Sequence, residues 1–297
     1  MNKKTRSRLG THKGAHRAQA PLSAVPAERE RLDLALVARG LAASREQARA
    51  RILAGDVLVD GRAATKPGAL VDERAALEVR AAPPFVSRGG EKLAHALARF
   101  GVRVADRVAL DAGASTGGFT DCLLQQGARR VYAVDVGYGQ LDWRLRQDPR
   151  VVVMERTNLR QLEALPEPID LATLDLSFIS LRLVLGTVWR LLRPAGEVVA
   201  LVKPQFEAGR GQVGRGGVVR DPAVHRAVLE QVLSWAAAHG FAPRGLTASP
   251  LRGPAGNIEF LVHLLKRETG SAETPDTTAA HREQLIESAL AEAATVG

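Results

Sequence analysis

The sequence contains one cysteine, Cys122, among 297 residues. A single thiol excludes an intramolecular disulfide and a cysteine-rich metal site, and it suits a reducing compartment such as the cytosol. Cys122 follows a glycine-rich turn on a predicted helix, and the sequence indicates no base beside it. We therefore interpret it as a packing residue rather than a nucleophile.

Long apolar runs are also absent. No segment has the roughly eighteen consecutive apolar residues of a membrane-spanning helix, and the polar N-terminus is unlike a secretory signal. We therefore expect no membrane insertion.

Basic residues outnumber acidic ones, giving a formal net charge of +9 and a pI near 10.4. This balance favours a polyanionic partner, because clustered Lys and Arg release counterions when they neutralise phosphates. Nucleic acid and an anionic membrane surface would both fit. Residues 1–28 are predicted to be a disordered basic arm, for which a solvated tail and a segment that contacts RNA are equally good interpretations.

A small α+β unit is predicted over residues 29–80. Apolar residues recur at helical spacing over 32–41, and Ser44, with a glutamine three residues later, opens a second helix over 45–53. The alternating segment 57–62 predicts a strand that carries an Asp-Gly hairpin turn, and residues 71–79 form a further predicted strand.

This unit resembles the RNA-binding domain first described in a small-subunit ribosomal protein. The matching residues are Arg31-Leu32-Asp33, Gly40-Leu41, Ser44-Arg45, Ala48, Gly55, Val57, Val59-Asp60-Gly61 and Lys66-Pro67. The resemblance implies that Arg45, Arg49, Arg51 and Lys66 contact RNA phosphates. The alternative is an ordinary charged helix face, since residues 29–88 hold eleven basic and eight acidic side chains and charge alone does not decide.

Consecutive prolines mark residues 81–86 as a linker to a second domain over 87–267, and residues 268–297 are predicted to be a flexible tail or a frayed helix. Strands and helices alternate within the second domain, which favours an α/β, Rossmann-like fold with a seven-stranded, mostly parallel sheet. A ligand is expected at the carboxyl ends of its strands. The predicted strands are 108–111, 130–135, 151–155, 170–175, 197–202, 241–248 and 258–265.

The first of these strands ends in a turn of small residues, Asp111 to Gly118, that opens a helix. Glycines there allow close approach of a cofactor, where larger residues would collide with it. The turn fits neither a P-loop, because no lysine follows, nor a Gly-x-Gly-x-x-Gly fingerprint. About twenty residues later the next strand ends in Asp135, placed to accept a hydrogen bond from a ribose hydroxyl. A nucleoside cofactor is therefore expected.

The acidic residues favour S-adenosylmethionine over NAD, because Asp111 and Asp135 would repel a pyrophosphate and suit a sulfonium. After the third strand, Glu155 and Asn158 could reach the nucleoside, although a loop acid and a turn-forming asparagine are nearly as good interpretations. The candidate cofactor-binding residues are Asp111, Gly113, Ser115, Thr116, Gly117, Gly118, Asp135, Val136, Glu155 and Asn158.

Four ionisable residues, Lys92, Asp175, Lys203 and Glu259, lie at or beside the ends of predicted elements on the ligand side. Charges in such apolar surroundings are costly unless they are paired, so they form either structural ion pairs or an active site. Each alone would more often be structural. Together, beside a predicted methyl donor, they favour catalysis.

The order of motifs over residues 29–265 resembles the TlyA family of ribosomal-RNA 2′-O-methyltransferases, proteins often labelled hemolysins. The matching segments are SRGGEKL at 87–93, DAGASTGGFT at 111–120, DVGYGQL at 135–141, ERTN at 155–158, DLSFIS at 175–180, VKPQFE at 202–207, GGVV at 216–219, and SP through GN at 249–257. The resemblance implies a catalytic tetrad of Lys92, Asp175, Lys203 and Glu259, with a cytidine in ribosomal RNA or in ribosomal subunits as the target.

A ribose 2′-hydroxyl is a poor nucleophile at neutral pH, so a group must accept its proton or stabilise the developing alkoxide. Lys203 is the candidate for either role, oriented by the other three residues, and the chemistry needs no metal. Two other function classes remain: a membrane-active cytolysin and a non-catalytic RNA-binding protein. Within the enzyme class, methylation of a small molecule or a protein is the weaker alternative.

Overall fold

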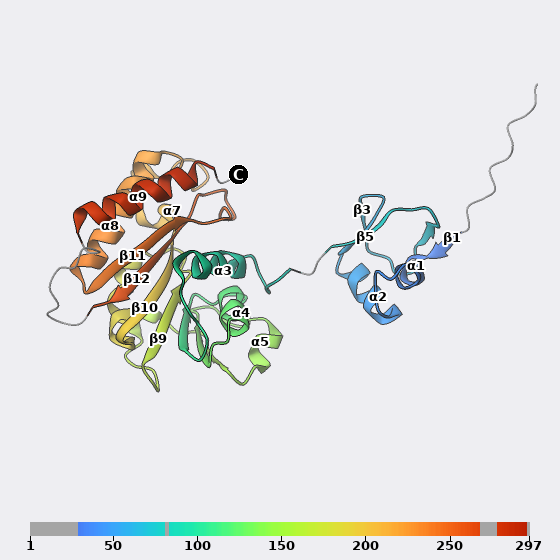
Figure 1. Cartoon of the computed structure of the whole chain (residues 1–297), viewed down its shortest axis with the longest axis horizontal. Helices are drawn as coiled ribbons and strands as arrows, with labels where there is room; N and C mark the ends of the chain where they lie inside the picture. Colours follow the sequence, from blue (N-terminus) through green and yellow to red (C-terminus); the bar gives the residue numbers. More distant parts are fainter. Residues whose placement is uncertain (1–28, 81–82, 268–277, 296–297) are drawn as a thin grey trace, which may run out of the picture. The chain divides into compact units, whose positions relative to one another are not determined.

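The computed structural model describes residues 29–80, 83–267 and 278–295, and it divides the chain into two compact units, Met1–Ala82 and Pro83–Gly297 (Figure 1). The boundary falls inside the predicted linker. Phe85 and Val86 pack against the core of the second unit, so the predicted linker extends too far toward the C-terminus. The predicted basic arm at 1–28 lies outside the described residues.

In the described residues of the first unit, 29–80, two helices and two small sheets surround a core in which Leu32, Leu36 and Ile52 are fully buried. The Ser44 hydroxyl accepts a hydrogen bond from the Gln47 N–H, as the capping spacing predicts. Residues 71–79 form two strands that belong to different sheets, so the prediction of one strand there is wrong. The elements are β1 (Arg29–Arg31), α1 (Leu32–Ala38), α2 (Arg45–Leu53), β2 (Val57–Val59), β3 (Arg62–Ala64), β4 (Leu70–Asp72) and β5 (Leu77–Val79).

A seven-stranded sheet in the order β11-β12-β10-β9-β6-β7-β8 forms the centre of the second unit. β12 pairs antiparallel with both of its neighbours, and the other pairings are parallel. This confirms the predicted Rossmann-like sheet. The strands are β6 (Val108–Ala112), β7 (Arg130–Val134), β8 (Val151–Met154), β9 (Ile169–Leu174), β10 (Leu192–Val202), β11 (Phe241–Ala248) and β12 (Phe260–Lys266).

Helices cover both faces of this sheet (Figure 1). Successive residues of a strand point to opposite faces, so Leu110 joins the core under α6, α8 and α9, whereas Ala109 joins the core under α3, α4 and α5. The helices are α3 (Gly89–Phe100), α4 (Gly118–Gln125), α5 (Trp143–Gln147), α6 (Leu185–Leu191), α7 (Pro204–Glu207), α8 (Pro222–Ala238) and α9 (Ala279–Ala293), with short 3₁₀ turns η1 (Leu159–Gln161), η2 (Leu181–Leu183) and η3 (Arg210–Gln212).

Residues 279–293 form helix α9, which agrees with the helical of the two alternatives predicted for residues 268–297. Its Ile286 and Ala289 are buried against the sheet, and the Glu292 carboxylate accepts hydrogen bonds from the Ala248 N–H and the Thr247 hydroxyl of edge strand β11. The helix thus covers an edge strand that would otherwise expose unpaired backbone groups. Residues 268–277 lie outside the described part of the chain.

Cys122 is buried in α4, where burial raises the pKa of its thiol to about 12. A thiol that stays protonated in an apolar core fits the predicted packing role.

Candidate active site

The charged residues singled out from the sequence meet at one edge of the sheet, because of its strand directions. β9 and β10 are parallel, so Asp175 and Lys203, which follow them, reach the same edge. β12 runs the opposite way, and Phe260 at its start pairs with Val202 at the end of β10. Glu259 therefore lies at the edge where the other strands end.

Lys92, Asp175, Lys203 and Glu259 line one pocket of about 240 Å³. They form two ion pairs. Lys92 Nζ lies 2.5 Å from Glu259 Oε2, and Lys203 Nζ lies 2.7 Å from Asp175 Oδ1. The structure thus brings all four predicted residues together, with each ammonium beside a carboxylate.

The first pair is the more deeply buried, with side-chain exposures of 9% for Lys92 and 1% for Glu259. A lone charge at such depth would be strongly destabilising, so each residue depends on the other. The loop before β12 also leaves room for the acid, because a Cβ on Gly253 would come within 2.5 Å of Glu259 Oε1.

A second pocket, of about 420 Å³, adjoins the first, and Gly113, Ser115 and Asp175 line both. Three predicted cofactor residues, Asp135, Val136 and Asn158, line the second pocket, whereas Thr116 and Gly118 line the first. No Lys or Arg is among the described residues that line the second pocket. It is therefore suited to a nucleoside, but not to a pyrophosphate.

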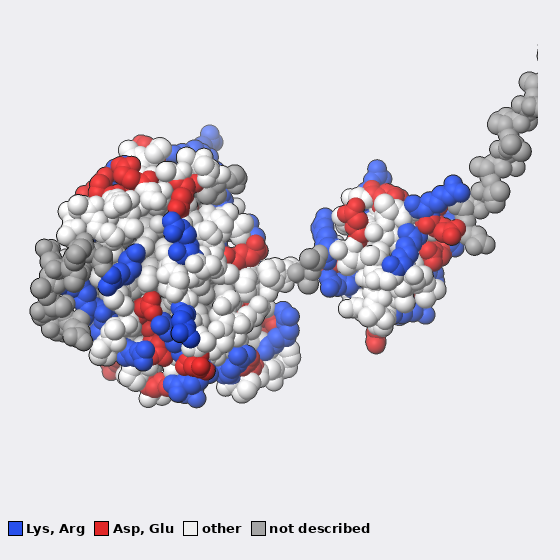
Figure 2. Space-filling model, in the orientation of Figure 1, with Lys and Arg blue, Asp and Glu red and all other residues white. Residues whose placement is uncertain are grey.

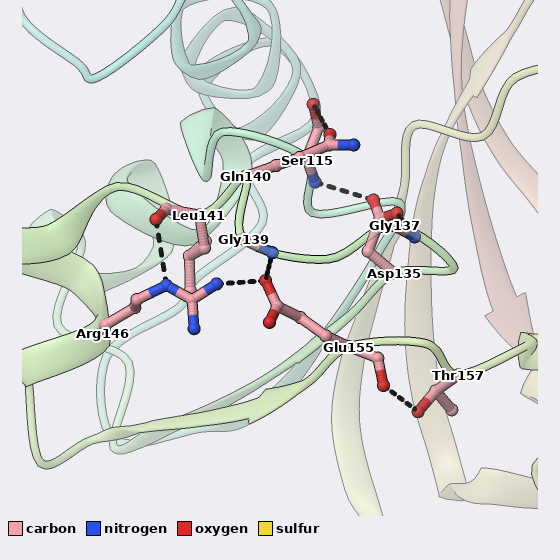
Figure 3. Close-up of polar contacts among 9 residues, drawn as sticks. All are labelled: Ser115, Asp135, Gly137, Gly139, Gln140, Leu141, Arg146, Glu155 and Thr157. Atoms are coloured by element: carbon pink, nitrogen blue, oxygen red, sulfur yellow. Dashed lines mark hydrogen bonds and ion pairs between the residues drawn. The ribbon is translucent and has the colours of Figure 1, made fainter.

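Asp135 organises the wall of this second pocket (Figure 3). Its Oδ2 accepts a hydrogen bond from the Ser115 N–H at 2.9 Å, and its Oδ1 accepts one from the Gly137 N–H at 2.6 Å. Each carboxylate oxygen can accept a further bond, so the predicted ribose contact is compatible with these two.

Two glycines of the turn are required by the protein atoms around them. A Cβ on Gly113 would lie 2.5 Å from the Asp175 carbonyl oxygen, and one on Gly117 would lie 2.2 Å from Leu145 Cδ1. Both residues also have positive φ. Gly117 lines neither pocket, so its predicted role in cofactor binding is not supported.

Asp111 also lines neither pocket. It is fully buried, its Oδ2 accepts a hydrogen bond from the Thr120 hydroxyl at 2.6 Å, and its Oδ1 has no partner among the described residues. Burial, with the nearby charges of Asp175 and Asp135, raises the pKa of this carboxyl to about 7, although the Thr120 bond opposes the shift. The predicted cofactor contact is not supported.

Glu155 is not among the residues that line the second pocket, and its carboxylate points toward Gly139 and Arg146 (Figure 3). Its Oε1 accepts hydrogen bonds from the Gly139 N–H, at 2.7 Å, and from the Arg146 guanidinium. Glu155 therefore fixes the loop after β7, which includes the pocket residue Val136, and the prediction that it reaches the nucleoside is not supported.

Sequence reasoning assigned no role to two residues of the loop after β9, although it singled out the DLSFIS segment. The Ser177 hydroxyl accepts a hydrogen bond from Lys203 Nζ at 2.9 Å. Phe178 has a φ of 64° and is 89% exposed, and its ring centroid lies 4.9 Å from that of Phe206. Both residues line the second pocket.

The basic residues predicted to contact RNA in the first unit differ in their surroundings. Arg45 lies 3.0 Å from the buried Asp33, and Arg51 donates a hydrogen bond to the Arg80 carbonyl. Arg49 and Lys66 are exposed and make no side-chain hydrogen bond or ion pair within the described residues. Acidic side chains lie among the basic ones on the visible face of each unit (Figure 2). Of the four residues predicted to contact RNA, Arg49 and Lys66 are thus the most available to a ligand.

Comparison with known proteins supports the assignment of both units. Residues 85–266 match the FtsJ-like methyltransferase family, and residues 30–75 match the S4 domain. The 16S/23S rRNA (cytidine-2′-O)-methyltransferase TlyA of Mycobacterium tuberculosis is 51% identical over 242 residues, covering 80% of this chain and 90% of that protein. The chain belongs to the TlyA family.

Other TlyA relatives carry a different name. Hemolysin A of Brachyspira hyodysenteriae is 41% identical over 238 residues, covering 79% of this chain and 99% of that protein. A solved structure from Streptococcus thermophilus, also named as a hemolysin, has 44% identity and a TM-score of 0.66, and it covers 90% of this chain and 96% of its own. No helix in the described residues of this TlyA-family chain is long and apolar enough to cross a bilayer.

Membership confirms that the chain is an S-adenosylmethionine-dependent methyltransferase with an RNA-binding S4 domain. The second pocket fits this cofactor, because it combines the carboxylates of Asp135 and Asp175 with the Asn158 amide and holds no cation that would repel a sulfonium.

Proposed function

We propose that this chain methylates the 2′-hydroxyl of a cytidine in ribosomal RNA, and that it acts in the cytoplasm, where that RNA is assembled into ribosomes. The observation that carries the proposal is the pocket in which Lys203 pairs with Asp175 and Lys92 pairs with Glu259, next to a pocket suited to a nucleoside. The name and identity of the M. tuberculosis relative support the same reaction.

The residues of the first pocket have different roles in this reaction. S-adenosylmethionine, when bound, supplies an electrophilic methyl group. Asp175, the partner of Lys203, lines both pockets, which supports a role for the Lys203 ammonium at the point where the ribose oxygen meets the methyl donor. Lys203 stabilises the developing alkoxide or, when neutral, accepts the hydroxyl proton.

Lys92 and Glu259 supply a fixed charge pair in the same pocket. Their burial makes them rigid, and rigid charges stabilise developing charge without reorganising. The acceptor ribose and the donor must also be held in line, and such positioning accounts for much of the rate in a two-substrate reaction.

Residues 29–80 supply affinity for RNA in this proposal. Exposed side chains such as Arg49 and Lys66 would neutralise phosphates, which gives binding that weakens with salt. The second unit supplies donor binding and chemistry.

The proposal is tested by mapping ribose methylation on ribosomal RNA from cells with and without this protein. We expect 2′-O-methylcytidine at one or more positions to disappear when the protein is removed and to return when the wild-type chain is restored. Unchanged methylation in both subunits would contradict the proposal.

A further inference from the structure

The Lys203 ammonium has two partners on one loop, the segment that follows β9. Asp175 Oδ1 lies 2.7 Å from Nζ, and the Ser177 hydroxyl oxygen lies 2.9 Å from it. The Asp175 contact is an ion pair without hydrogen-bond geometry, so Ser177 accepts the one hydrogen bond that the Lys203 ammonium donates within the described residues. An ammonium carries three N–H donors, which leaves two for groups in the pocket that Lys203 lines. A lysine side chain has several rotatable bonds, and a single carboxylate partner leaves much of that freedom in place.

The loop that carries Ser177 is fixed at both ends. At its start, the Asp175 N–H donates to the Ala112 carbonyl at 3.0 Å, and the Asp175 carbonyl packs against Gly113. Beyond Ser177, the buried Glu207 carboxylate accepts hydrogen bonds from the Ser180 hydroxyl at 2.5 Å and the Leu181 N–H at 2.7 Å.

Glu207 belongs to α7, the short helix that begins directly after Lys203. Glu207 therefore forms a second connection between the segment that carries Lys203 and the loop that carries Asp175 and Ser177, and this connection lies away from the pocket. Ser177 itself is exposed and makes no other side-chain hydrogen bond among the described residues, so its hydroxyl is dispensable for the fold.

We propose that Ser177 is a positioning residue for Lys203, whose hydroxyl, together with Asp175, holds the ammonium toward the acceptor ribose. The inference rests on the proposed function, because it assumes that Lys203 acts on a 2′-hydroxyl. Ser177 acts through Lys203 and needs no contact with either substrate.

The test compares Ser177→Ala and Ser177→Thr in the full chain, with ribosomal RNA and labelled donor at saturating concentrations. We expect Ser177→Ala to lower kcat about tenfold or more, the effect of one lost hydrogen bond to a charged group, while the donor Kd and the KM for RNA stay within about twofold. Ser177→Thr keeps the hydroxyl and should recover most of kcat. Ser288→Ala, an exposed serine on α9 that lines neither pocket, is the control.

Adding Ser177→Ala to Lys203→Ala closes a double-mutant cycle. Residual turnover should not fall further, because the serine acts only through the lysine. A normal kcat in Ser177→Ala, or a weakened donor Kd with kcat unchanged, would overturn the inference while leaving the proposed function intact. A wild-type chain that transfers no methyl group to ribose would overturn both.

Discussion

Lys92 and Glu259 form a buried ion pair across 167 positions of sequence, with Nζ 2.5 Å from Oε2. The pair joins the first turn of α3 to the start of β12. Because the pair is buried, its loss should affect the stability of the protein and its methyl transfer in different ways. Two variants can separate these effects.

Lys92→Met should destabilise the second unit by about 3–5 kcal/mol, because it leaves the Glu259 carboxylate buried without a partner. Lys92→Met combined with Glu259→Gln removes both charges and should recover most of that loss. Urea unfolding measures both variants. Methyl transfer should stay low in the double variant, and recovery of activity together with stability would show that the pair is only structural.

Asp135→Ala should weaken donor binding about tenfold or more, because it removes a charged acceptor from the second pocket and frees the Ser115 and Gly137 N–H groups that now bind it. Calorimetric titration with S-adenosylmethionine gives the affinity. Glu155→Gln is the matched control, since that acid lies outside the pocket, and it should change the affinity less. Equal losses in the two variants would contradict the assignment of Asp135.

Arg49→Ala and Lys66→Ala should each weaken RNA binding and lower the slope of log affinity against log salt by about one unit, as expected for one lost phosphate contact. Donor affinity should not change. Filter binding of ribosomal RNA at several salt concentrations measures both quantities, and an unchanged slope in both variants would remove these residues from the interface.

Arg45→Ala should behave differently, because Arg45 and Arg31 both pair with the buried Asp33. The hydrogen bonds from Arg31 and then Arg45 hold the pKa of Asp33 well below its usual range. Losing Arg45 should therefore lower the thermal stability of the first unit as well as any affinity for RNA, whereas Arg49→Ala should leave stability unchanged. A melting curve of each variant distinguishes the two cases.

Asp111 should make stability depend on pH. Burial raises the pKa of its carboxyl from the ordinary 3.8 to about 7, so the folded chain binds this proton more tightly than the unfolded chain does. Its contribution to stability is then fully present below about pH 4 and is lost as the pH rises to about 7. Asp111→Asn keeps an acceptor for the Thr120 hydroxyl and cannot ionise. As the pH rises between these values, the melting temperature of Asp111→Asn should increase relative to that of the wild type. A difference in melting temperature that does not change with pH would contradict a raised pKa for Asp111.

Much of this site can be predicted from the sequence, because the ends of the strands can be located along the chain. Asp175 and Lys203 each come directly after an apolar strand, and parallel strands place such residues at one edge. Glu259 reaches the same edge from the start of its strand because β12 runs the opposite way, a direction that periodicity does not reveal. Its charge beside an apolar strand grouped it with the others, and the family resemblance gave the same set.

Spacing does not tell which way a side chain faces. Asp111 accepts a hydrogen bond from Thr120 and Glu155 accepts one from Arg146, so their roles in cofactor binding stay predictions. The same holds for Gly117, where a Cβ would collide with Leu145. The sequence left residues 268–297 as a flexible tail or a frayed helix. Packing of α9 against β11, which a weak amphipathic pattern does not reveal, favours the helix over residues 279–293.

The central claim is that Lys203 enables methyl transfer to a ribose oxygen. The most direct test incubates ribosomal RNA with labelled S-adenosylmethionine and either the wild-type chain or Lys203→Ala, then digests the RNA to nucleosides and separates them. The account predicts label in 2′-O-methylcytidine with the wild type, and none above background with the variant, which should still bind the donor. Label on a base, or near-normal labelling of ribose by Lys203→Ala, would contradict it.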